Sequence, residues 1–313
     1  MVVFSATLNQ TAFLLIFIVA GYLLSRFNLI PSNAQSSLSK LENYLFIPAL
    51  VLGTFIGNFT TEKISSAWRL FLGSFILALI FIALAVVCVR FCSKDTYVRK
   101  IYLYGLSFSN FGFMGNAVVS ALFPEIFMEY LIFTLPLWIL IYLWGVPSLL
   151  MDDGSAKPSI GARLKNFLNP MFICMILGIL IGICAIPVPK FLSSVISSAS
   201  DCMSPVAMLL TGMTIAQCDL RKILANKSIY LVTFLRLIVF PMLFLTVIFL
   251  LPLPKTFSVC AVCSLAMPLG LNTIIIPSAY GKDTSVASGM ALVSHAISCI
   301  TIPMIFMLLD RMN

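Results

Sequence analysis

A polar cluster lies inside an apolar stretch near the first third of the chain. Within ten residues of the 100–123 segment stand Ser107, Ser109, Asn110, Gly112, Gly115 and Asn116. Glycine destabilises a helix interior by about 1 kcal/mol relative to alanine, and asparagine competes for backbone hydrogen bonds. At mid-depth in a membrane, non-helical backbone persists only where it is buried in protein or lines a watery cavity. The cluster therefore predicts an interrupted helix that contributes to a polar site.

A second cluster of the same character occupies the 256–279 segment. It contains Pro268, Gly270, Asn272, Thr273 and Pro277, and its prolines remove helical donors and force a break. Two interrupted helices at matching positions of two halves point to the midplane site of a transporter. The ends of half-helices can hold an anion, and the asparagine amides can donate to a carboxylate. The alternative is that the glycines serve helix packing and that the asparagines are satisfied within the protein.

Two ionisable residues are predicted to lie deep in apolar segments. Arg236 is either a counter-charge for the substrate or a clamp on carbonyls freed near Pro241, because a buried arginine is normally paired or hydrated. His295, the single histidine, is either a packing residue or a proton-coupling group that titrates near neutral pH.

Acidic residues are absent from the central parts of the 100–123, 128–150, 256–279 and 284–309 segments, and Glu42 lies toward the end of its own segment. Cation-coupled exchangers use buried carboxylates, so this distribution favours an anion substrate. The nine cysteines are interpreted as packing residues. We expect no metal, no cofactor and no catalytic residues.

Composition excludes a water-soluble enzyme. Of 313 residues, 61% are hydrophobic and 10% are charged, against about 25% charged in a soluble domain. The lipid bilayer is therefore an expected partner. A net charge of +8 is consistent with basic cytoplasmic loops and does not require nucleic acid.

Ten apolar segments are long enough to form helices that span a membrane, so the fold class is an all-α polytopic membrane protein. The segments are 5–25, 38–57, 69–91, 100–123, 128–150, 168–186, 192–216, 228–251, 256–279 and 284–309. A polar linker at 152–167 separates a first five-helix repeat (1–151) from a second (168–313). Three landmarks recur in order in the two halves, pairing Pro48 with Pro205, Asn110 with Asn272, and Pro136 with Pro303.

Charge distribution predicts the orientation of the chain. Alternate sides receive thirteen and five of the 19 Lys and Arg residues, with Arg236 inside a segment. By the positive-inside rule the linker is cytoplasmic, both termini lie outside the cell membrane, and the two halves are inverted.

Four short motifs resemble the auxin efflux carrier family, which includes plant PIN-type auxin exporters and bacterial transporters assigned to malate, malonate and similar acids. The motifs are N-F-G-F-M-G (110–115), M-P-L-G-L-N-T (267–273), A-Y-G-K-D (279–283) and I-P-M (302–304). The resemblance covers nearly the whole chain. Ala117 stands where the family pattern tends to have proline, so the first break is expected to rest on Gly112, Gly115 and Asn116.

The resemblance implies two inverted five-helix repeats, with segments 1, 2, 6 and 7 as a scaffold and segments 3–5 and 8–10 as a moving unit. Segments 4 and 9 would cross with Asn110 and Asn272 at the crossing, the moving unit would travel in elevator fashion, and the scaffold would form a homodimer. The leading expectation is a secondary carrier of small organic anions. A sodium-coupled carrier of similar fold and a ligand-sensing module that does not transport are the alternatives.

Overall fold

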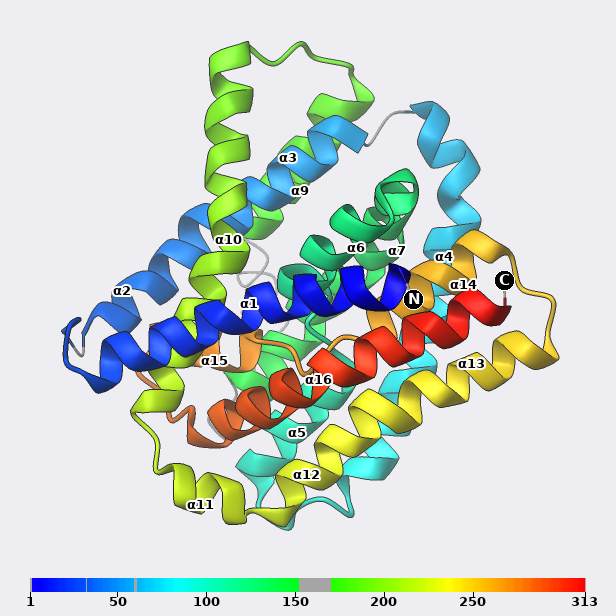
Figure 1. The fold of residues 1–313 in the computed structure, drawn as a ribbon. Helices are drawn as coiled ribbons and strands as arrows, with labels where there is room; N and C mark the ends of the chain where they lie inside the picture. Colours follow the sequence, from blue (N-terminus) through cyan, green and yellow to red (C-terminus); the bar gives the residue numbers. More distant parts are fainter. Residues whose placement is uncertain (1, 32, 59–60, 152–169, 313) are drawn as a thin grey trace.

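The computed structural model describes residues 2–31, 33–58, 61–151 and 170–312, and every regular element in these ranges is helical (Figure 1). The elements of the first half follow one another as α1 (Val2–Arg26), α2 (Ala34–Leu41), η1 (Glu42–Phe46), α3 (Ile47–Asn58), α4 (Thr61–Val89), α5 (Thr96–Ser107), η2 (Phe111–Gly115), α6 (Asn116–Leu122), η3 (Pro124–Ile126), α7 (Phe127–Leu140) and η4 (Ile141–Leu150). The predicted linker, 152–167, falls outside the described residues.

The second half has a corresponding sequence of helices. They are α9 (Pro170–Ile183), α10 (Lys190–Ala216), α11 (Leu220–Ala225), α12 (Lys227–Phe234), η5 (Leu235–Val239), α13 (Phe240–Leu250), α14 (Lys255–Leu265), α15 (Asn272–Ala279) and α16 (Ser285–Met312). One or more of the helices of the two halves lies in each of the ten predicted segments, with non-helical residues at 108–110 and 266–271 inside the fourth and ninth.

Within the described residues, five helical stretches are long and apolar enough to cross a membrane. These are Phe4–Arg26, Trp68–Val89, Pro124–Leu150, Lys227–Leu250 and Ser285–Met312. Among the shorter apolar helices are Phe111–Leu122 and Lys255–Leu265, which belong to the two segments that the sequence predicts to be interrupted.

Helix packing divides the described helices into two groups. In the first group α1 and α3 both pack against α10, and α3 also packs against α9. In the second group α4 packs against α5 and α7, and α14 packs against α7 and α13. The groups meet chiefly where α16 lies along α1, and also where α15 contacts α2 (Figure 1).

Two glycines allow α1 and α10 to cross in close contact (Figure 1). A Cβ atom at Gly21 would lie 2.0 Å from the Leu209 carbonyl oxygen, and one at Gly212 would lie 1.9 Å from the Ile18 carbonyl oxygen. Backbone atoms cannot move aside as a flexible side chain can. These glycines therefore hold the first and second halves of the chain together.

We expect Gly21→Ala and Gly212→Ala each to lower the free energy of unfolding by about 1–3 kcal/mol, because the added methyl groups force the helices apart. Thermal unfolding of the purified protein measures the effect. Gly57→Ala is the matched control, since a Cβ at Gly57 meets nothing within 4 Å. A loss in the control equal to that in Gly212→Ala would contradict the role given to the helix crossing.

Candidate substrate site

The two interrupted helices meet at their breaks. The first break separates α5 from η2, and the second separates α14 from α15. The backbone N–H of Asn110 donates to the Pro268 carbonyl at 2.8 Å, and the N–H of Gly270 donates to the Phe108 carbonyl at 3.2 Å. These bonds form a short antiparallel bridge between Ser109 and Leu269. Backbone N–H and C=O groups in an apolar interior need hydrogen-bond partners. At each break, where the helical bonds are interrupted, the backbone of the other break supplies such partners.

The first break lies earlier in the chain than the sequence predicted. The backbone becomes extended at Phe108 (φ −123°, ψ 113°), whereas Gly112, Gly115 and Asn116 are already helical. The expectation that these three residues carry the break is wrong, because pairing with the Pro268–Gly270 backbone interrupts the helix before it reaches them.

Gly112 and Gly115 instead allow aromatic side chains to approach the helix. A Cβ at Gly112 would lie 2.6 Å from the Trp138 ring, and one at Gly115 would lie 2.2 Å from the Tyr130 hydroxyl. The same hydroxyl donates to the Phe111 carbonyl at 3.1 Å. In the second interrupted segment Pro268 lies in the break, but Pro277 lies inside α15, so it does not interrupt the helix as predicted.

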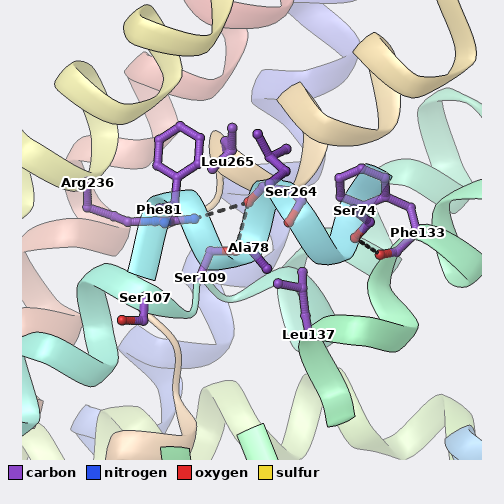
Figure 2. Close-up of a pocket in the computed structure, with 11 residues that line it drawn as sticks. Ser74, Ala78, Phe81, Ser107, Ser109, Phe133, Leu137, Arg236, Ser264 and Leu265 are labelled. Carbon is purple, nitrogen blue, oxygen red and sulfur yellow. Dashed lines mark hydrogen bonds between the residues drawn. The ribbon is translucent and has the colours of Figure 1, made fainter. Parts of the chain in front are cut away.

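Arg236 holds carbonyl groups at the ends of both interrupted helices. Its side chain is 1% exposed and donates from Nη1 to Leu106 (3.0 Å), from Nη2 to Ser264 (3.3 Å) and from Nε to Met267 (3.3 Å). Figure 2 shows the bonds from Arg236 and from the Ser109 hydroxyl (2.7 Å) converging on the Ser264 carbonyl. The carbonyls that Arg236 binds are those of the breaks, and not carbonyls near Pro241.

A small cavity adjoins the Arg236 side chain (Figure 2). Its polar lining consists of Ser74, Ser107, Ser109 and Ser264 together with Arg236. The space amounts to about 20 Å³, enough for about one water molecule. All of its lining residues belong to the second packing group or to the crossing, so it lies away from α1 and α10.

A second cavity lies at the crossing itself and brings together five of the predicted site residues. These are Ser109, Asn110, Gly112, Gly270 and Asn272. Tyr104 and Trp138, which were not predicted as site residues from the sequence, also line it. We call this space the crossing pocket. It holds about 10 Å³, room for about one water molecule, so an organic acid requires a conformation in which it is wider.

The two asparagines use their amide nitrogens within the protein. Asn110 Nδ2 lies 2.9 Å from His295 Nε2, and Asn272 Nδ2 donates to the Tyr104 hydroxyl at 3.1 Å. Both Oδ1 atoms are buried, and neither has a hydrogen-bond partner among the described residues. Each amide nitrogen carries a second hydrogen. The asparagines at the crossing pocket therefore offer acceptors as well as donors, whereas only donors were predicted from the sequence.

The remaining predicted residues lie around the crossing without lining the pocket. Asn116 lines another cavity between α3 and α7, beside Thr134 and Trp138. The Thr273 hydroxyl donates to the Gly270 carbonyl at 2.8 Å and stabilises the start of α15. Pro277 lies at the far end of α15, where its carbonyl accepts from Tyr280 and Lys282.

Two residues were not predicted correctly from the sequence: the burial of Glu42, and Tyr104 as a hydrogen-bond partner of Asn272. Glu42 is 0% exposed, and both of its carboxylate oxygens lack a partner among the described residues, so the expectation that it lies toward a segment end does not describe its burial. The chain therefore contains a buried carboxylate, and the distribution of acidic residues no longer favours an anion substrate over a coupled cation. Tyr104 was identifiable in principle, because it belongs to the same segment as Asn110.

Comparison with protein families identifies the class of protein to which the chain belongs. A family described as "membrane transport protein" matches the chain in two parts, residues 6–161 and 157–306, as expected for an internally repeated protein. No curated protein sequence matches the chain. Because the match covers nearly all of the sequence, the chain belongs to the auxin efflux carrier family and is a membrane transport protein.

Proposed function

We propose that the chain is a secondary transporter of small organic anions, mono- or dicarboxylates, which bind at the crossing of the fourth and ninth segments. One observation carries the proposal: the starts of two half-helices border the same pocket. Phe111, Gly112 and Phe113 begin the helix Phe111–Leu122, Asn272 begins α15, and all four residues line the crossing pocket. The first N–H groups of a helix lack partners within the helix, and its dipole favours an anion there.

The proposed architecture is ten spanning helices in two inverted repeats. The packing of α1, α3, α9 and α10 supports a scaffold, and the packing of α4–α7 with α12–α16 supports a moving unit. The narrow crossing pocket supports alternating access, because substrate entry needs a wider state. Homodimerisation through the scaffold, a cytoplasmic linker and external termini belong to the same proposal.

A sodium-coupled carrier is the second candidate. The unpaired Oδ1 atoms of Asn110 and Asn272 favour it, because amide and carbonyl oxygens are the ligands that hard cations prefer. A sensing module that binds an anion without moving it shares the same pocket, and only flux separates the two.

We expect purified protein in proteoliposomes to take up radiolabelled malate or malonate with saturation, and uptake to persist when choline replaces sodium. Gly57→Ala, an exposed position where the added Cβ meets no atom within 4 Å, is the variant expected to transport as the unchanged protein does. Loss of uptake in choline would support the sodium-coupled carrier. Binding without flux would support the sensing module, and absence of both across a panel of mono- and dicarboxylates would contradict the proposed function.

A further inference from the structure

His295 lies at the boundary between the two packing groups, and it is the single histidine of the chain. Its side chain is 3% exposed near the middle of α16. On one side it packs against residues of α1, α10 and η2 around a gap too small for a water molecule, and on the other side it contacts Asn110 at the crossing. The histidine thus connects the proposed scaffold to the proposed anion site.

The hydrogen bonds of His295 define its neutral form. Nδ1 lies 2.9 Å from the Ala291 carbonyl, which can only accept, so Nδ1 carries the hydrogen. In the neutral ring Nε2 is then an acceptor, and it receives the amide N–H of Asn110 at 2.9 Å. This arrangement leaves Asn110 Oδ1 as the amide atom without a partner among the described residues, and Asn110 lines the crossing pocket.

A proton at Nε2 reverses the requirement. Both ring nitrogens of a protonated histidine are donors, so Nε2–H needs an acceptor where the Asn110 NH₂ group now stands. Rotation of the amide by about 180° places Oδ1 against Nε2–H and turns the NH₂ group toward the pocket. An acceptor that repels a carboxylate is thereby replaced by a donor that binds it.

We propose that His295 is the proton-binding site of this carrier and that Asn110 converts the charge of His295 into affinity for the anion. The proposal rests on the proposed function. A hydronium ion of the solvent gives one proton to Nε2, so that its O–H bond breaks as the Nε2–H bond forms, neutral water leaves and the Nδ1–H bond is kept. The bound pair of proton and carboxylate therefore adds no net charge for a monocarboxylate. Because binding linkage is reciprocal, the anion raises the affinity of His295 for a proton by the same factor.

The groups around His295 do not take part in the proposed response to protonation, which involves His295 and Asn110. The side chains packed around the gap beside the ring are uncharged, namely Thr11, Leu14, Leu15, Ile18, Met114 and Met208. Several helices that pack against α16 carry buried titratable or charged side chains: Arg236 on η5, Cys260 and Cys263 on α14, and Tyr102 and Tyr104 on α5. Three further such side chains are partly buried, namely Tyr22 on α1 and Tyr97 and Lys100 on α5. On α16 itself, Cys299 lies one turn beyond His295. The other charged side chains described on these elements are exposed: Arg26, Arg99, Lys190, Asp201, Arg221, Lys227, Lys255, Asp310 and Arg311. Of the buried groups only Arg236 is charged near neutral pH, and it binds three carbonyls.

Asn272 provides the internal comparison. Its partner is the Tyr104 hydroxyl, which can donate as well as accept. The Asn272 amide can therefore turn either way without a change of protonation. Of the two asparagines at the crossing, only Asn110 has its orientation tied to a proton.

Nitrogen-15 NMR of protein labelled at histidine tests the proposal without assignment, because the chain has one histidine once any affinity tag is removed. Between pH 6 and 8 without anion we expect a neutral ring with hydrogen on Nδ1. Saturating malonate should convert the signal to imidazolium. Asn110→Asp should give imidazolium without any anion, because an aspartate can only accept, whereas the matched variant Asn272→Asp should leave the ring neutral.

Flux measurements provide the second arm. Malonate uptake into proteoliposomes should carry protons with it, recorded by an internal pH dye, and its apparent affinity should rise about tenfold per unit of falling pH while one proton is taken up per anion. His295→Gln should remove this pH dependence. A ring that stays neutral in anion-saturated protein, or in Asn110→Asp, overturns the proton site while leaving anion transport intact. Absence of anion binding at every pH refutes the proposed function, and the proton coupling with it.

Discussion

Arg236→Met should lower the free energy of unfolding by about 3–5 kcal/mol, the largest stability loss we expect from a single substitution in this chain. The substitution leaves the carbonyls of Leu106 and Met267 without their buried side-chain donor, while the Ser264 carbonyl keeps only its bond from the Ser109 hydroxyl. Each buried group that loses its partner costs about 1–3 kcal/mol, and removal of the buried charge offsets part of that total. Thermal or denaturant unfolding in detergent measures the loss.

Arg236→Lys should be intermediate, because a lysine keeps the charge but lacks the planar fork that reaches three carbonyls. Lys255→Met, which removes an exposed cation, is the control. Arg236 does not line the crossing pocket, so Arg236→Gln should leave measurable anion binding in the folded fraction. Abolished binding with unchanged folding would show instead that Arg236 is the counter-charge of the substrate.

Removing either asparagine amide should weaken anion binding by about ten- to hundredfold. A hydrogen bond to a charged group contributes about 1.5–3 kcal/mol, and Asn110 and Asn272 line one pocket. The losses in Asn110→Ala and Asn272→Ala should not add, because residues that share one ligand group are coupled. The double variant should lose less than the sum of the single losses.

A double-mutant cycle of binding free energies makes the measurement, with thermal unfolding to separate damage to the fold. Asn116→Ala is the matched control, since Asn116 is a buried asparagine of the same segment that lines a different cavity. Neutral effects of both Asn110→Ala and Asn272→Ala would remove the asparagines from the site. Additive losses would place them on separate parts of the ligand.

The sequence was sufficient to predict which helices are interrupted and that Asn110 and Asn272 lie near one another. Lipid cannot satisfy a backbone N–H or C=O, so a cluster of glycine, proline and asparagine inside an apolar run indicates a break within that run, although Gly112, Asn116 and Pro277 themselves lie in helices. The position of the first break was not predictable in this way. It depends on Pro268 and Gly270, whose backbone pairs with residues 108–110 and ends α5 before the glycines of its own segment.

Tertiary structure also decided what the buried polar groups do. His295 and Asn110 are 185 positions apart, yet their contact determines which amide atom of Asn110 remains for a ligand. Arg236 took its partners from the ends of two other helices, and Glu42 became fully buried although it stands early in its segment. A side chain's neighbours along the sequence predict the helix to which it belongs, but they did not predict the burial of Glu42. Its hydrogen-bond partners come from helices that only folding brings together, and those partners determine whether it clamps the backbone, binds a proton or faces the substrate.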